Sequence, residues 1–291
     1  MRKSSLYLPD RLKAALSARA AATGTSEAVI IREAIEARLK SPPSPGVADA
    51  PERPLPGRLV GVGVGPGEAD LLTVRALAAL RRADRVLAPT SAVDSVGRAE
   101  AVVRQAAPDV VVERVVFAMA PSRTARNRSL DSAARCVVSH LERGEEVAWI
   151  TLGDPLTYST FSSVAQRVMR RRPATVVTQV PGIMAFQALA ARTGTVIADE
   201  RTRVSIRTAL DGDDLSADFA DDTSTVVVYK GGRRLPELAA AATAHGRAEA
   251  AVAGELLGMP GERVGTLASL SGGPASYLAT VIVPARMEDD R

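Results

Sequence analysis

The sequence contains few of the residues on which many classes of protein depend. Cys136 is the only cysteine among 291 residues, which excludes an intrachain disulfide and fits a reducing compartment. Aromatic residues make up 3% of the chain, so a hydrophobic core must consist mainly of Ala, Val and Leu. No apolar run approaches the ~20 residues of a transmembrane helix, and the N-terminus lacks the apolar stretch of a secretory signal. These absences predict a cytoplasmic protein with no membrane partner.

Histidine is equally scarce, and this restricts the chemistry that the chain can carry. His140 and His245 are the only two histidines, and each lies late in a predicted helix, where we expect a surface residue. The sequence has no histidine pair, cysteine pair or acidic cluster at the spacing of metal ligands, so we expect no protein-bound metal. It also shows no general base, and the sequence therefore assigns no catalytic residue.

The length and composition are those of a globular protein with more than one domain. Hydrophobic residues make up 46% of the chain and charged residues 24%. At 291 residues the chain can form two or three compact domains. Residues 41–57 contain six prolines and no periodic apolar pattern, which predicts an extended linker. This linker separates a short N-terminal module, residues 1–40, from a larger body that begins at residue 58.

The formal charge lies almost entirely in the N-terminal module. Residues 1–40 contain eight Lys or Arg and four Asp or Glu, whereas the rest of the chain is balanced, and the whole chain carries a net charge of +4. A small basic module on a neutral body suggests a polyanion as its partner. A solvated helical face is the alternative interpretation of the same charge.

The module has the pattern of one strand and two helices. Polar and apolar residues alternate over 3–8, as in a half-buried strand, and Pro9-Asp10 begins a helix that Gly24 ends. Apolar residues follow at helical spacing in both helices: Leu12, Ala15, Leu16 and Ala20, then Ile31, Ala34, Ile35 and Leu39. Elements this small cannot form a stable core alone, so we expect the module to pair with a second copy.

This order of elements, over residues 2–39, resembles the ribbon-helix-helix family of DNA-binding dimers. The resemblance implies that Leu6 and Leu8 point into a shared core. It also implies that three outward side chains face a DNA major groove: Lys3, Ser5 and Tyr7. A dimerisation module without DNA binding is the alternative, because tyrosine is not a common reader of bases.

The body alternates strands and helices, which predicts an α/β fold with two sheets in tandem. We place one domain at residues 58–180 and a second at 181–291. The predicted strands cover 59–64, 86–87, 110–117, 147–152, 175–180, 204–208, 225–230 and 277–283. The predicted helices cover 74–82, with Thr73 as the N-cap, 123–142, 159–171 and 236–245, and another helix follows Pro181-Gly182. A further segment of the second domain covers 250–253.

The first strand of the body runs into the glycine-rich turn Gly61–Gly67. Such turns present backbone N–H groups to ligands. The turn does not match the dinucleotide fingerprint G-x-G-x-x-G, whose last glycine would be replaced by Pro66, Glu68 or Asp70. It also lacks the lysine of a phosphate-binding P-loop, so the pattern argues against a pyrophosphate site.

The stretch VGVGVGPGEADLLT at 60–73 closely resembles the first motif of the tetrapyrrole (corrin/porphyrin) methylase family. Further motifs of that family follow in order: ADRVLAP at 83–89, TLGDPLTYSTF at 151–161, VPGIMAF at 180–186 and VVVYKGG at 226–232. Five motifs in family order, within residues 58–286, identify the body as a member. Some stretches are most similar to the precorrin-2 C(20)-methyltransferases: VFAMAP at 116–121, TLGDPLTYSTF, and GMPGERV at 258–264.

The resemblance implies methyl transfer from S-adenosylmethionine, bound in a cleft between the two α/β domains. It also implies a set of residues bordering that donor: Pro66, Leu152, Gly153, Asp154, Thr157, Met184, Ala185 and Tyr229. Met184 and Ala185 replace a small or hydroxylated pair of relatives, and Tyr229 stands where many relatives have methionine. We therefore expect backbone contacts to the donor more than conserved side-chain contacts.

The implied substrate is a reduced tetrapyrrole with several carboxylates, which forked arginine donors bind well. The candidates after the third strand are Arg123, Arg126 and Arg128, while Arg167 and residues 170–172 fit a solvated helix end better. The expected reaction is methylation of ring carbon 20 of precorrin-2, or its cobalt form, in cobalamin biosynthesis by a homodimer. The alternatives are another corrin-ring methylase, or a DNA-binding regulator whose body senses a corrinoid or S-adenosylmethionine.

Overall fold

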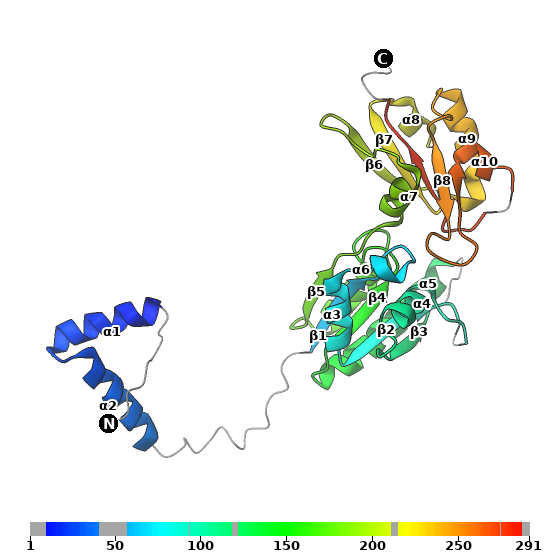
Figure 1. The fold of residues 1–291 in the computed structure, drawn as a ribbon. Coiled ribbons are helices and arrows are strands. Elements are labelled where there is room, and N and C mark those ends of the chain that lie inside the picture. The colour runs from blue at the N-terminus through cyan, green and yellow to red at the C-terminus, as the bar shows by residue number, and fades with distance from the viewer. Residues whose placement is uncertain are drawn as a thin grey trace. The chain divides into compact units, whose positions relative to one another are not determined.

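The structure is a computed structural model that describes residues 10–40, 57–92, 94–117, 122–210, 215–273 and 275–286. The chain divides into two compact units, Met1–Arg53 and Pro54–Arg291 (Figure 1). Within these described ranges, no helix has the length and apolar character needed to cross a membrane.

The first unit contains two helices, α1 (Asp10–Thr23) and α2 (Glu27–Lys40). They are connected by a turn in which Gly24 has a φ of +65°, a conformation that glycine adopts without steric cost. Glu27 joins the two helices, because its carboxylate forms an ion pair with Lys13 and accepts a hydrogen bond from Ser17 Oγ at 2.6 Å.

The two helices of the module were expected from the sequence and are confirmed. The predicted strand over 3–8, which includes Lys3, Ser5 and Tyr7, lies outside the described residues. Residues 41–56 of the predicted linker also lie outside them.

The second unit begins with a parallel sheet of five strands in the order β3-β2-β4-β1-β5. The strands are β1 (Arg58–Gly63), β2 (Arg85–Thr90), β3 (Val112–Val116), β4 (Val147–Thr151) and β5 (Val176–Val180). Parallel sheets are covered on both faces and therefore have nearly continuous apolar strands. The central strand β4, whose five residues are all buried, follows this rule.

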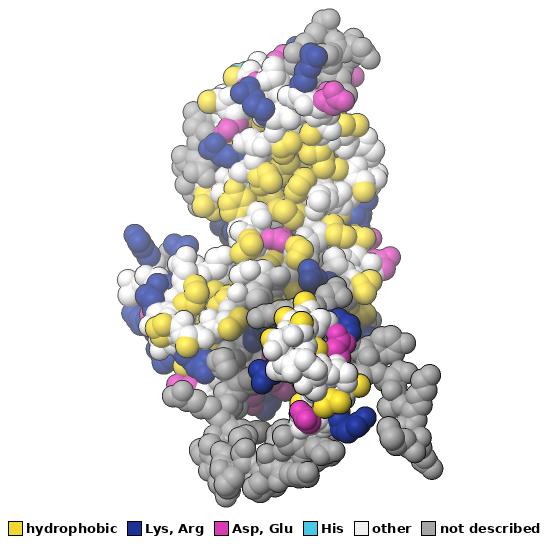
Figure 2. Space-filling model, turned by 90° about the vertical axis from the view of Figure 1, so that its left-hand side faces the viewer, with side chains coloured by type: hydrophobic (Ala, Val, Ile, Leu, Met, Phe, Trp, Pro, Cys, Tyr) yellow, Lys and Arg dark blue, Asp and Glu magenta, His cyan; other side chains and the backbone are white. Residues whose placement is uncertain are grey.

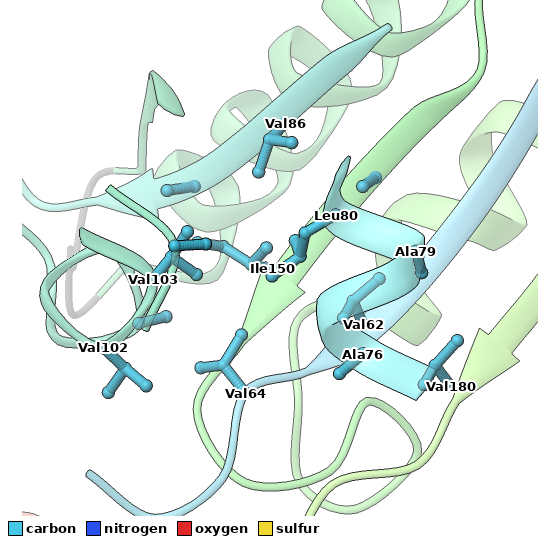
Figure 3. Packing of buried hydrophobic residues seen from close by; sticks show 14 of the residues in the cluster. Val62, Val64, Ala76, Ala79, Leu80, Val86, Val102, Val103, Ile150 and Val180 are labelled. Atoms are coloured by element: carbon cyan, nitrogen blue, oxygen red, sulfur yellow. The ribbon is translucent and has the colours of Figure 1, made fainter. Parts of the chain in front are cut away.

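Helices cover both faces of this parallel sheet. They are α3 (Val74–Arg82), α4 (Arg98–Ala106), α5 (Arg123–Glu142) and α6 (Phe161–Arg171), with a short 3-10 helix η1 (Ala69–Leu71). Helices α3 and α4 pack on one face, where Val62, Ile150 and Leu80 belong to one core cluster (Figure 3). Helices α5 and α6 pack on the other face around Trp149. The predicted cap is confirmed, since Thr73 Oγ1 accepts a hydrogen bond from the backbone N of Ala76 at 3.1 Å.

A second, mixed sheet follows, with the order β6-β7-β10-β8-β9. Its strands are β6 (Arg203–Thr208), β7 (Ser224–Tyr229), β8 (Val252–Glu255), β9 (Arg263–Thr266) and β10 (Thr280–Val283). Strands β6 and β7 are parallel, and the other pairs are antiparallel. The two sheets in tandem confirm the predicted α/β fold class.

Helix α7 (Ala185–Thr193) packs on one face of the second sheet. Helices α8 (Ser216–Ala220), α9 (Leu235–Ala244) and α10 (Leu267–Leu270) pack on the other face. A second 3-10 helix, η2 (Gly232–Arg234), precedes α9. The sequence analysis did not predict α4, α8, β9 or α10.

Arg247 is an unusual part of this second core, because a charged side chain with 3% exposure lies among apolar groups. Its guanidinium donates hydrogen bonds to five backbone carbonyls, at distances from 2.7 to 3.1 Å: Phe219, Asp221, Ser224, Val283 and Pro284. Burial lowers the pKa of Arg247 from its usual value. The cation holds together the start of β7, the end of β10 and the segment before β7.

We expect Arg247→Met to lower the free energy of unfolding by about 3 kcal/mol or more, because buried carbonyls would lose their donor. Chemical denaturation followed by circular dichroism measures the change. Arg286→Met is the matched control, since Arg286 is exposed and its Nη2 donates to the Gly246 carbonyl at 3.1 Å. A loss for Arg247→Met no larger than for the control would contradict this account.

Candidate functional site

Three loops meet at the carboxyl ends of the adjacent strands β4, β1 and β5, and each contributes a glycine to the meeting point. A Cβ atom added to Gly63 would lie 2.5 Å from the carbonyl O of Gly153 and 2.6 Å from the backbone N of Gly182. A Cβ atom on Gly182 would lie 2.1 Å from the same carbonyl O. Only glycine permits backbones to approach this closely. We call these residues the three-glycine contact.

Hydrogen bonds hold the three loops in place. The backbone N of Gly153 donates to the Gly65 carbonyl at 2.7 Å. The carboxylate of Asp154 accepts from the Gly182 backbone N at 3.2 Å and from the Leu156 backbone N at 2.8 Å. Asp154 therefore shapes its own loop and also fixes the loop after β5.

Gly153 leaves one side of its backbone open. Its φ is +69°, and a Cβ atom added to it would meet no atom within 4 Å. Pro66 beside it is buried, and Leu152 packs against the N-terminal core cluster. The loops thus combine close backbone packing with open space next to Gly153, which suits a ligand that binds main-chain groups.

The turn after β1 is also fixed to the second half of the unit. A Cβ atom on Gly67 would lie 2.0 Å from the Leu257 carbonyl O, so these two backbones are in direct contact. Arg192 of α7 forms ion pairs with Glu68 at 2.7 Å and with Glu262 at 2.8 Å. The glycine-rich turn is therefore held by contacts from both halves.

Two tyrosines form a further link between the halves. Tyr158, at a φ of +49°, donates a hydrogen bond from its hydroxyl to the Ile206 carbonyl at 2.8 Å. Its ring centroid lies 6.0 Å from that of Tyr229. The hydroxyl of Tyr229 accepts from the Phe186 backbone N at 3.4 Å, and burial raises the pKa of Tyr229 to about 12. This hydroxyl stays protonated at neutral pH and cannot serve as a general base.

The remaining predicted donor contacts lie on the same loops. Met184 is the N-cap of α7, and its backbone N donates to Gln187 Oε1 at 2.9 Å. Ala185 is the first residue of that helix, and both are half-buried. Thr157 is half-buried in the loop between β4 and α6. The assignment of these residues to a bound donor stays a prediction.

The predicted substrate arginines are exposed in the first turns of α5: Arg123, Arg126 and Arg128. In a parallel β–α unit, a helix begins near the carboxyl end of the strand it follows, so these residues belong to the sheet edge that carries the loops. Among the described residues, no hydrogen bond or ion pair joins these arginines to the three-glycine contact. Arg167 and Arg171 instead bond to Asp131 of α5, which supports a structural role for that group.

Sequence reasoning missed several contributors to the site. Gly182 was part of a recognised motif, but its contact with Gly63 and Gly153 depends on strand order, which the motif does not contain. The positive φ of Tyr158 and the two ion pairs of Arg192 had no signal in the sequence.

The expectation about histidine needs a correction. His140 is 7% exposed and is not a surface residue, and its Nδ1 lies 2.7 Å from Glu145 Oε2. Although no metal was expected, the structure brings the side chains of Glu113, Cys136 and His140 within reach of a common ion. Their distance in the sequence hid this cluster, because the residues belong to β3 and α5.

The fold and the loops together define an α/β protein with a candidate small-molecule site, built from main-chain atoms at the carboxyl edge of a parallel sheet. Residues 58–271 match the family model described as Tetrapyrrole (Corrin/Porphyrin) Methylases, and residues 5–41 match Ribbon-helix-helix protein, copG family. The chain belongs to the tetrapyrrole (corrin/porphyrin) methylase family. It is a C-methyltransferase that depends on S-adenosylmethionine.

Individual relatives and solved structures are consistent with this family assignment. The chain is 32% identical over 240 residues to a precorrin-2 C(20)-methyltransferase of Sinorhizobium sp, an alignment that covers 78% of this chain and 95% of the relative. The structure of a cobalt precorrin-4 methyltransferase is similar with a TM-score of 0.59 and 20% identity, over 78% of this chain and 94% of that one. A uroporphyrin-III C-methyl transferase from Thermus thermophilus, complexed with S-adenosyl homocysteine, has a TM-score of 0.56 and 21% identity, over 78% and 97%.

We expect Gly182→Ala to lower the free energy of unfolding by about 1–3 kcal/mol, because the new methyl group overlaps the Gly153 carbonyl. Thermal or chemical denaturation measures the loss. Gly272→Ala is the control, since a Cβ there meets no atom within 4 Å, and it should be neutral or slightly stabilising. Equal stability of the two variants would show that the three loops do not approach as described.

Proposed function

We propose that this chain transfers a methyl group from S-adenosylmethionine to ring carbon 20 of precorrin-2, or of its cobalt form, in cobalamin biosynthesis. The three-glycine contact, with open space beside Gly153, is the observation that carries the donor site. The 32% identity to a precorrin-2 C(20)-methyltransferase supports the choice of ring carbon. Another ring position on a corrin intermediate is the alternative within the family.

The residues around the three-glycine contact suit the methyl donor. Main-chain groups of Pro66 and of the loop from Leu152 to Asp154 would border it. Met184, Ala185 and Tyr229 would supply a half-buried apolar wall, and Thr157 a hydroxyl. When bound, S-adenosylmethionine supplies an electrophilic methyl group on a positively charged sulfur.

In such a reaction the side chains and loops of the protein position the reactants and need not act as acids or bases. Methyl transfer from a sulfonium requires alignment with the accepting carbon and exclusion of water, which rigid loops provide. Tyr229 is protonated and hydrogen-bonded, so it positions neighbouring groups and does not remove a proton. Arg123, Arg126 and Arg128 would orient the carboxylates of the substrate, because guanidinium groups bind carboxylates in pairs.

The reaction is tested with the purified full chain, methyl-labelled donor and precorrin-2. We expect one labelled methyl group for each ring, located at carbon 20 by mass spectrometry and NMR. Label at another carbon would overturn the ring assignment and support the alternative methylase. Donor binding without any transfer would support a regulator that senses the donor or a corrinoid.

We expect Asp154→Ala to weaken binding of S-adenosylmethionine by about tenfold or more, because the loops after β4 and β5 lose the carboxylate that joins them. Isothermal titration calorimetry measures the dissociation constant. Asp109→Ala is the control, since Asp109 forms its ion pair with Arg81 on the surface. Unchanged affinity of Asp154→Ala would remove this loop from the donor site.

We further propose that the chain is a homodimer whose N-terminal module pairs and binds DNA. The match of residues 5–41 to the ribbon-helix-helix family supports this, as does the excess of basic residues in 1–40. No side chain described between residues 13 and 34 is buried, so the module has no core of its own there.

Exposed hydrophobic residues of the second unit, such as Val196 before β6 and Val204 within it, offer a second surface for pairing. Figure 2 shows hydrophobic side chains gathered on one face of the molecule.

We expect the full chain to bind duplex DNA with an affinity that falls as salt increases, because phosphate contacts release counterions. Removal of residues 1–40 should abolish this binding and leave methyl transfer intact. Lys3→Ala should weaken this binding, because the resemblance to the ribbon-helix-helix family implies that Lys3 faces the major groove. Fluorescence anisotropy measures all three proteins, and equal binding by the truncated chain would reject the proposal.

A further inference from the structure

Glu113, Cys136 and His140 form a cluster of potential ligands far from the proposed donor site. Glu113 lies near the start of β3, and the other two lie in the last half of α5, so the cluster belongs to the amino edge of the parallel sheet. One ligand atom from each side chain lies within 4.8 Å of the other two. His140 Nε2 and Glu113 Oε1 are 3.9 Å apart. Cys136 and His140 are four residues apart and therefore share one helix face.

A neighbouring carboxylate orients His140 for ligation. Glu145 Oε2 lies 2.7 Å from His140 Nδ1 and also forms an ion pair with Arg143 at 3.1 Å. Arg85 approaches the other oxygen, Oε1, at 3.5 Å. A carboxylate paired with two arginines is ionised and only accepts hydrogen bonds, so it favours the tautomer with the proton on Nδ1. Arg143 Nη2, which can only donate, lies 2.5 Å from the same Nδ1 and favours the opposite tautomer. A metal ion on Nε2 would select the tautomer in which Nδ1 donates to Glu145.

The contact between His140 Nδ1 and Glu145 is one that metal-binding histidines commonly make. In protein metal sites, the second ring nitrogen commonly donates to a carboxylate, which fixes both the tautomer and the direction of the ring. His140 is also 7% exposed, so its ring has little freedom to turn away. Glu113 and the half-buried Cys136 complete a nitrogen, sulfur and oxygen donor set.

We propose that Glu113, Cys136 and His140 bind a divalent transition metal ion, with zinc as the best fit, and that water completes the tetrahedron. Thiolate, imidazole and carboxylate ligands are the set that Zn²⁺ prefers. Zinc bonds of about 2.0–2.3 Å place neighbouring ligand atoms about 3–4 Å apart, so shifts of roughly 1 Å close the site. On binding, the Cys136 S–H bond breaks, its proton passes to solvent, and a sulfur–metal bond replaces one to water.

The ion would connect an edge strand to the helix that covers it. Among the described strands, β3 is paired on one side alone, and four of its five residues are exposed or half-buried, Val115 being the buried one. Ligands from β3 and α5 would oppose local opening of this edge. The site lies at the sheet edge opposite the three-glycine contact, so the ion would stabilise the fold without touching the reaction.

The test uses untagged, chelator-treated full chain titrated with Co²⁺, a spectroscopic substitute for Zn²⁺. We expect one equivalent to bind with a thiolate-to-cobalt absorption band and the visible bands of tetrahedral cobalt, and Zn²⁺ to displace it. Cys136→Ser should remove the thiolate band and weaken zinc binding at least tenfold. Glu145→Gln should weaken it about tenfold to a hundredfold, as loss of an orienting carboxylate does. His245→Gln, outside the cluster, should bind as the unaltered chain does.

A second measurement keeps the proposal testable if a variant folds poorly. In the unaltered chain, Zn²⁺ should slow alkylation of Cys136 and raise the melting temperature. Substoichiometric binding, absence of the thiolate band, or an alkylation rate indifferent to Zn²⁺ would overturn the proposal. In that case Glu145, Arg143 and His140 would form no more than an ion-pair network at the end of α5.

Discussion

The close approach of three backbones at Gly63, Gly153 and Gly182 is the constraint on which the candidate site depends. It arises from strand order, because β4, β1 and β5 are neighbours in a parallel sheet and end at the same edge. The loops that follow are therefore forced together, and any side chain at Gly63 or Gly182 would separate them. Asp154 converts this steric proximity into a fixed geometry through its bond to the Gly182 backbone N. The open side of Gly153 is then a defined surface.

The second half of the unit completes this surface. The contact between Gly67 and the Leu257 carbonyl leaves no room for a side chain at this position of the turn after β1. Arg192 anchors the same turn through Glu68, and Tyr158 reaches from the loop after β4 to the β6 backbone. Loops held from both sides are suited to excluding water, which matters more for methyl transfer than an acid or a base does.

Much of the fold was accessible from the sequence because parallel strands are apolar throughout. The run Val147–Thr151 could only be a buried strand, and Thr73 carried a specific capping signal. Strand β9 was missed, since four residues that include Gly265 give no usable periodicity. The site was accessible only through resemblance to a family, because contacts such as that between Gly63 and Gly182 depend on strand order. His140 was judged by its place in a helix, whereas its burial depends on the neighbouring strand.

The two edges of the parallel sheet show why contacts between residues far apart in the sequence cannot be predicted from the sequence pattern alone. A β–α unit returns the chain to its starting edge, so residues at a strand's beginning meet residues at the end of the next helix. Glu113 and His140 meet in this way at the amino edge, while residues that end a strand meet at the carboxyl edge. The carboxyl edge is made of glycine backbones and open space, which favours reversible binding of a ligand. The amino edge is made of charged side chains in mutual contact, which favours stability. The proposed reaction and the ion pairs that stabilise the sheet therefore lie at opposite edges of the same sheet.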